Sequence, residues 1–145
     1  MIALIQRVNW AQVHIGGALH ADIGQGLLAL IGIEKDDNDK LAQKLLDKII
    51  AYRIFADADG KMNLGLKDVG GELMLISQFT LAAETQKGLR PGFSPAKPQG
   101  QAEVIYDRLV QAAREQHEVV QSGKFGADMQ VSLENDGPVT FILKG

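Results

Sequence analysis

Two hydroxyls and an amide occur together in Ser77-Gln78-Phe79-Thr80, where an apolar stretch of the chain ends. A serine or threonine nucleophile needs a base within hydrogen-bond reach, and the sequence places no histidine nearby. Backbone N–H groups at the end of a strand become free to face a ligand. An active site in this SQFT segment would therefore work through hydrogen-bond donors and positioning. The alternative is a strand that simply ends in polar residues.

A second candidate segment is Phe125-Gly126-Ala127, which follows Ser122-Gly123-Lys124. An aromatic ring among small residues can stack a nucleobase, as in sites for single-stranded nucleic acid. The alternative is a phenylalanine that belongs to the hydrophobic core.

The usual signatures of metal and cofactor sites are missing from the sequence. The histidines, His14, His20 and His117, have no ligand spacing, and there is no cysteine. The acidic clusters at 36–39 and 57–60 lack the glycine and glutamate positions of a calcium loop. The sequence therefore predicts neither a metal nor a cofactor.

The segment NDGPVT, residues 135–140, lies between two stretches that both read as strands. Asp136-Gly137 suits a tight turn, because glycine accepts a positive φ. Pro138 fixes its own φ and has no N–H to donate. The pattern therefore predicts a stiff hairpin turn.

The rest of the chain alternates between strand and helix patterns. Apolar periodicity predicts two amphipathic helices, at about 38–55 and 102–117. Strands are predicted at 2–8, 13–15, 27–33 and 72–80, and short strands and turns after the second helix. The order favours an α/β fold of mixed α+β character, with helices packed over one face of mixed sheets.

Between strand 72–80 and the second predicted helix lies a segment, here named the basic loop (residues 85–101), that holds three of the four prolines. Its charged residues are all basic: Lys87, Arg90 and Lys97.

Length and charge limit the class of protein. A chain of 145 residues suits one domain, and a net charge of -3 argues against coating nucleic acid by bulk charge. No apolar run approaches the roughly 20 residues that span a bilayer, and no signal peptide is recognisable at the N-terminus. We expect a cytoplasmic protein that is not embedded in a membrane.

Several motifs together resemble the D-aminoacyl-tRNA deacylases, and the resemblance runs from the first strand to the last. It implies a single domain (1–145) that hydrolyses the ester joining a D-amino acid to the 3′ end of tRNA, without a metal or cofactor. It also implies packed β layers covered by helices on one side, and a homodimer with active sites at the interface. The motifs are SQFTLA (77–82), GLRPGFSPA (88–96), SGKFGADMQVSL (122–133) and NDGPVT (135–140).

The resemblance gives the Gly-Pro pair a function. In the family this peptide is cis and projects from one subunit into the site of the other, which here implies Gly137-Pro138, with Arg7 holding it in place. A rigid wall where the side chain of an L residue must go would reject every L residue. Glycine has no side chain to reject, so glycine wrongly attached to alanine tRNA should also be a substrate.

The resemblance also implies how the ester is cleaved. Backbone N–H groups of Phe79 and Thr80 would hold the oxyanion, while Ser77 and Gln78 would orient the amino acid and ribose. Thr80 aligns with a threonine proposed as nucleophile in the family, but the missing base favours a positioning role. The vicinal 2′-hydroxyl of the tRNA would activate water, which would require RNA rather than DNA.

Other residues would bind the tRNA. The terminal adenine would contact Phe125, Gly126 and Met129, and the basic loop would contact phosphates through Lys87, Arg90 and Lys97. Two residues depart from the family pattern, because Leu89 stands where a basic residue is common and Gly65 where serine is common. Two other functions remain as alternatives to a deacylase: a non-catalytic dimeric module that binds an RNA 3′ end, and a purely structural dimer.

Overall fold

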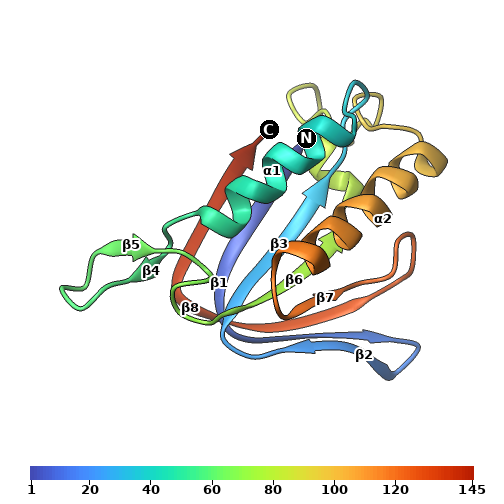
Figure 1. Cartoon of the computed structure of the whole chain (residues 1–145). Helices are drawn as coiled ribbons and strands as arrows, with labels where there is room; N and C mark the ends of the chain where they lie inside the picture. Colours follow the sequence, from blue (N-terminus) through green and yellow to red (C-terminus); the bar gives the residue numbers. More distant parts are fainter.

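The computed structural model describes all residues, 1–145, as a curved sheet with two helices on one face (Figure 1). The mixed α/β class is as predicted. The strand order is β2-β1-β3-β6-β7, β8 also pairs with β1, and β4 and β5 form a separate hairpin. The elements are β1 (Ile2–Ile15), β2 (Ala18–Ile23), β3 (Gly26–Gly32), α1 (Asp39–Ala51), β4 (Phe55–Ala56), β5 (Met62–Leu64), β6 (Glu72–Ser77), the 3-10 helix η1 (Phe79–Ala82), α2 (Gln99–Gln116), β7 (Val120–Ser122) and β8 (Gln130–Lys144).

Strand β1 is continuous, so the prediction of two separate strands at 2–8 and 13–15 is wrong. One edge of β1 pairs with β3 over Ile2–Val8 and then with β2 over Ala11–Ile15. The other edge pairs with β8 along almost its whole length. These partner strands satisfy the backbone hydrogen-bonding groups on both sides of the polar Asn9, where the local sequence alone suggested a break in the strand.

The parallel strands β3 and β6 form the centre of the fold and are buried on both faces. Leu27 and Leu73 belong to the larger hydrophobic cluster, which includes both helices. Leu28 and Met74 point to the opposite face and pack against the curled half of β1 and β2. At Gly26 a side chain would not fit, because a Cβ there would lie 1.8 Å from the carbonyl oxygen of Glu72.

The two helices lie close to their predicted ranges. The Asn38 side chain caps α1 by accepting a hydrogen bond from Leu41 N at 3.0 Å. Helix α2 begins at Gln99 rather than 102, directly after Pro98, whose φ of -52° leads into a helix. Neither helix combines the length and the hydrophobicity that a membrane crossing requires.

The NDGPVT segment is a bulge within β8, so the predicted hairpin turn is wrong. Asn135 pairs with Val8 and Thr140 with Gln6, which leaves residues 136–139 unpaired between them. Both flanks run antiparallel to the same strand, β1, and the chain therefore does not reverse. Local sequence showed an interruption of the ladder, but only the pairing partner decides whether such an interruption turns the chain. We name residues 136–139 the Gly-Pro bulge.

The Gly-Pro bulge has the backbone that the family resemblance implied. The Gly137-Pro138 peptide is cis, and Gly137 has a φ of +129°, a region open to glycine. Both residues are exposed on the surface of the chain.

The β4–β5 hairpin projects from the body of the molecule (Figure 1). Its connection contains the turn predicted at Asp59-Gly60, and Gly60 has a φ of +78°. The Asp57 carboxylate accepts hydrogen bonds from the Asn63 side chain and the Lys61 N–H, which lower the pKa of Asp57.

Candidate active site

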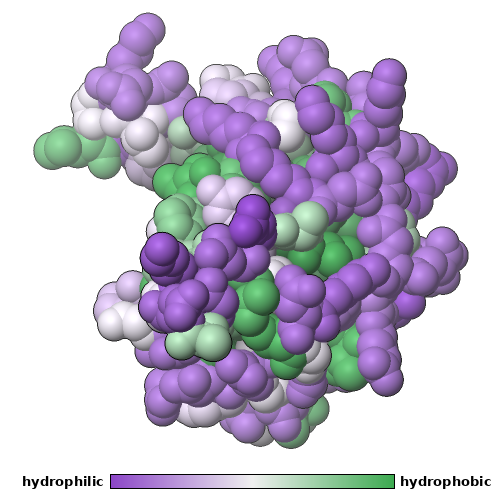
Figure 2. All heavy atoms as spheres, turned by 60° about the vertical axis from the view of Figure 1, so that its left-hand side comes forward, coloured by the Kyte–Doolittle hydropathy of each residue, from purple (hydrophilic) through white to green (hydrophobic).

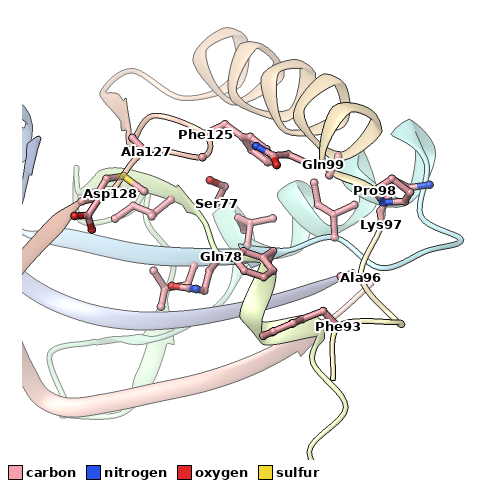
Figure 3. A pocket seen from close by; sticks show the side chains of 18 of the residues that line it. Ser77, Gln78, Phe93, Ala96, Lys97, Pro98, Gln99, Phe125, Ala127 and Asp128 are labelled. Carbon is pink, nitrogen blue, oxygen red and sulfur yellow. The ribbon is translucent and has the colours of Figure 1, made fainter. Parts of the chain in front are cut away.

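A cavity of about 760 Å³ opens beside the carboxyl end of β6. Its walls come from the SQFT segment, the basic loop, the start of α2 and the segment after β7, which the fold brings together from distant parts of the chain (Figure 3). Of its 20 lining residues, 12 are hydrophobic. The residues predicted for the site that line it are Ser77, Gln78, Phe79, Lys97, Phe125, Gly126 and Met129.

The SQFT segment is positioned by the end of β6. Gln78 N donates to Ile31 O at 2.7 Å, which continues the β3–β6 pairing for one more residue. The chain then turns into η1, whose first N–H groups, those of Phe79 and Thr80, have no acceptor within the helix. The Gln78 side-chain amide donates to the Thr80 hydroxyl, which is exposed. Thr80 is thus next to the cavity but is not one of its lining residues.

The opposite wall is held by a tyrosine that the sequence did not single out. Tyr106 of α2 donates its hydroxyl to Leu75 O at 2.9 Å, and its ring packs against Phe125 with centroids 5.8 Å apart. Burial raises the pKa of Tyr106, so the phenol stays protonated and can donate. Phe125 packs against the larger core and also lines the cavity, and its contact with a nucleobase stays a prediction.

Glycine at position 123 leaves room for the side chain of Met129. A Cβ on Gly123 would lie 2.7 Å from the sulfur of Met129, and Gly123 N donates to Leu75 O at 2.9 Å. Glycine at this position therefore lets the segment after β7 lie against β6 while Met129 reaches the cavity.

The three basic side chains of the basic loop are in different surroundings. Lys97 lines the cavity, and its ammonium donates to Lys35 O at 2.7 Å. Lys87 and Arg90 are exposed and do not line the cavity.

The Gly-Pro bulge does not reach the cavity of its own chain. Arg7 pairs with Leu27 in the β1–β3 ladder, whereas Ser77 pairs with Ile31, so bulge and cavity flank opposite ends of β3. Gly137 is likewise absent from the cavity lining. One chain therefore does not unite the two predicted parts of the site.

Arg7 holds the Gly-Pro bulge at its first residue. Its Nε donates to Asp136 O at 3.1 Å and lies 3.2 Å from the Asp136 carboxylate. Its Nη1 donates to Ile54 O at 2.9 Å, which ties the bulge to the segment after α1. Arg7 thus contacts the residue directly before Gly137, and its role in holding the Gly-Pro pair stays a prediction.

No group of three or more histidine, cysteine, aspartate or glutamate side chains is arranged to hold a metal ion. His117 is buried, and its Nε2 donates to Gly71 O at 2.7 Å, which is a structural contact.

Comparison with known proteins identifies the family. The sequence profile described as "D-Tyr-tRNA(Tyr) deacylase" matches residues 4–144. The chain belongs to this deacylase family.

Relatives in the deacylase family match the chain over nearly its whole length. The D-aminoacyl-tRNA deacylase of Stutzerimonas stutzeri (strain A1501) is 55% identical over 144 residues, which cover 99% of both chains. The enzyme of the same name from Escherichia coli O81 (strain ED1a) is 53% identical with the same coverage.

Two solved structures share the fold of this chain. A chain named "c-Myc DNA Unwinding Element Binding Protein" is 38% identical and superposes with a TM-score of 0.95, over 100% of this chain and 99% of its own. A probable eukaryotic D-amino acid tRNA deacylase superposes with a TM-score of 0.85 over 98% and 97% of the two chains. At 16% identity, this second likeness shows the fold alone.

The cavity of this deacylase-family chain includes residues that sequence reasoning missed. Phe93 belongs to the GLRPGFSPA motif but has no predicted role, and Gln99 lies in the first turn of α2 rather than in the predicted loop. An aromatic residue inside a proline-rich basic loop was the available signal for Phe93. Asp128 gave no signal in the sequence. The other lining residues without a predicted role include Ala96, Pro98 and Ala102.

Proposed function

We propose that this chain hydrolyses the ester bond of D-aminoacyl-tRNA and releases free tRNA and a D-amino acid. The observation that carries the proposal is the full-length match to relatives named D-aminoacyl-tRNA deacylase, at up to 55% identity. It is supported by the cavity, because residues of two distant motifs, SQFT and the segment at Phe125, line it together. A tRNA substrate would place the protein in the cytoplasm.

The cavity suits the terminal adenosine of tRNA and its amino acid. Its volume of about 760 Å³ and largely apolar lining are typical of sites for small ligands. The Phe125 ring would contact the adenine, with Gly126 and Met129 beside it, and Lys87, Arg90 and Lys97 would face phosphates.

Hydrolysis would depend on backbone donors. When water attacks the ester carbonyl, negative charge develops on its oxygen, and the Phe79 and Thr80 N–H groups would hold that charge. Ser77 and Gln78 would orient the amino acid and ribose. The carboxylate among the lining residues is that of Asp128, which lies at the edge of the cavity with its oxygens turned away from Ser77 (Figure 3). The vicinal 2′-hydroxyl of the tRNA is therefore our candidate for activating water.

Selection against L residues would require a second copy of the chain. In one chain the Gly-Pro bulge lies at the opposite end of β3 from the cavity, and Gly137 and Pro138 are exposed. In a homodimer with sites at the interface, the bulge of one subunit would enter the cavity of the other. There it would occupy the space that the side chain of an L residue needs. D residues and glycine would be accepted.

Strand β8 offers a surface for this dimer. It pairs only with β1, so its other edge is open, and Val131, Phe141 and Ile142 are exposed apolar side chains on it. Figure 2, which turns the β8 side of Figure 1 forward, shows apolar surface open between polar side chains. We expect a mass of two chains in sedimentation analysis, and a monomer at working concentrations would contradict the cross-subunit site.

The decisive experiment compares matched D- and L-tyrosyl-tRNA and follows loss of the ester. We expect rapid loss for D, little for L, and loss of glycine from glycyl-tRNA. Equal rates on both enantiomers would contradict the chiral wall. No loss of either ester, with tRNA still bound, would favour the non-catalytic module that binds an RNA 3′ end.

The role of the tRNA 2′-hydroxyl has its own test. A substrate whose terminal ribose is 2′-deoxyribose should bind but turn over at least about 100-fold more slowly, since general-base catalysis contributes about 10²–10⁴-fold. Undiminished turnover would show that a protein group, with Asp128 as the first candidate, is the base. Asp128→Asn would then remove the activity. We propose RNA rather than DNA as the partner, although one relative is named for a DNA element.

A further inference from the structure

The mouth of the cavity carries a pair of exposed aromatic rings. Phe79 of η1 and Phe93 of the basic loop lie with ring centroids 5.1 Å apart, and both line the cavity. Their residues are 58% and 42% exposed, respectively. Burying large apolar side chains is favourable, so two rings left open at a cavity mouth suggest a ligand that covers them.

The Phe93 ring is held in place by the backbone of the basic loop. Glu84 and Gly92 exchange two backbone hydrogen bonds, of 2.7 and 3.0 Å, directly before Phe93. Ala96 N donates to Phe93 O at 3.0 Å, and Lys97 N donates to Ile33 O at 3.0 Å. The ring is therefore presented by an ordered loop rather than by a loose one, which lowers the entropic cost of using it for binding.

The surroundings of the ring favour a nucleotide. All charged residues of the basic loop are cationic, and aromatic rings among basic residues are the usual surface for single-stranded nucleic acid. Phe93 lies across the cavity from Phe125, the candidate for the terminal adenine (Figure 3). A nucleotide joined to that adenosine would pass the ring pair if it left the cavity on the side of Phe79 and Phe93. A second copy is the competing occupant, because in the proposed dimer its Gly-Pro bulge would enter the same cavity; the charge of the basic loop favours the nucleotide.

We infer that Phe79 and Phe93 form a stacking subsite for the nucleobase that precedes the terminal adenosine in the 3′ single strand. This inference rests on the proposed function, because it takes the cavity as the site of the terminal aminoacyl-adenosine. The subsite makes binding depend on a base that takes no part in the chemistry. Because every base has a flat face, it would accept different bases at this position.

The test compares two D-tyrosyl esters, one of adenosine and one of a dinucleotide that ends in adenosine. Stacking one base on an aromatic ring corresponds to about 5- to 150-fold in affinity. We expect kcat/KM of the wild type to favour the dinucleotide at least about fivefold. Phe93→Ala should bring this ratio close to one, Phe93→Leu should lower it, and Phe93→Trp should keep it. Phe93 is the better position to vary, because Phe79 also supplies a proposed backbone donor.

Leu89→Ala is the matched control, since Leu89 is a fully exposed apolar residue of the same loop. It should leave the ratio unchanged, and melting temperatures and sedimentation establish that each variant is folded and keeps its oligomeric state. A wild-type ratio of one, or a ratio that Phe93→Ala does not change, would overturn the subsite. Loss of the dimer in Phe93→Ala would assign the ring to contact between copies instead. If the wild type cleaves neither ester and no D-tyrosyl-tRNA, the proposed function itself fails.

Discussion

Replacing Arg7 by methionine is expected to weaken discrimination between D- and L-aminoacyl-tRNA. The side chain is 13% exposed and donates from Nε to Asp136 O, the carbonyl directly before Gly137. Methionine keeps much of the length and the apolar stem but removes every donor. The Gly-Pro bulge would lose its fixed position, and a wall that can move no longer excludes a side chain.

The expected fall in the D-over-L ratio of kcat/KM follows from the contacts that Arg7 makes. Its charged hydrogen bond to the Asp136 carbonyl contributes about 2 kcal/mol, within the range of about 1.5–3 for charged donors. The ion pair adds at most about 1 kcal/mol, because the Asp136 side chain is 41% exposed and screened by water. If the restraint of about 2 kcal/mol acts wholly on the position of the wall, the ratio of kcat/KM for D over L falls by about 30-fold.

The assay measures ester loss from D- and L-tyrosyl-tRNA for the wild type, Arg7→Met and Arg53→Met. Arg53 is the matched control, because its guanidinium donates two hydrogen bonds of 2.9 Å to Asn63 and contacts no residue of the Gly-Pro bulge. It should keep the wild-type ratio. A folded Arg7→Met dimer that discriminates within twofold of the wild type would refute the reasoning.

Three further substitutions test other parts of the structure. Asp37→Asn should lower the free energy of unfolding by about 2 kcal/mol in urea titration, because the N-terminal amine loses the buried Asp37 carboxylate at 2.8 Å but keeps that of Glu34 at 2.7 Å; exposed Asp36→Asn should have little effect. Gly26→Ala should cost at least about 3 kcal/mol, since its Cβ would lie 1.8 Å from Glu72 O, whereas Gly100→Ala in open space within α2 should stabilise by about 0.5–1 kcal/mol. Thr80→Ala should retain substantial deacylation, and complete loss in a folded variant that binds tRNA would restore the nucleophile.

Helices and buried strands could be predicted because their signals are local. Apolar residues at helical spacing placed α1 and α2 within a few residues, and the Asn38 cap fixed the start of α1. Continuous apolar runs identified β3 and β6, which are buried on both faces. β6 ends at Ser77, before the predicted strand end at 80, because residues 79–82 turn into the 3-10 helix η1.

Long-range pairing could not be predicted in the same way. The NDGPVT segment contains every local cue of a hairpin turn, yet both of its flanks pair with β1, and it is a bulge. The break expected after Val8 is absent, because β2, β3 and β8 supply partners from outside the segment.

By itself the sequence determined the family, the mixed fold class and the residues around which a site could form, since motifs and periodicity are properties of neighbouring residues. Only the tertiary structure decided which of these residues meet. It brought Ser77 and Phe125 to one cavity, added Phe93 and Tyr106, and left Gly137-Pro138 at the far end of β3. The physical reason is that register and packing depend on partners distant in the chain, which no local pattern specifies.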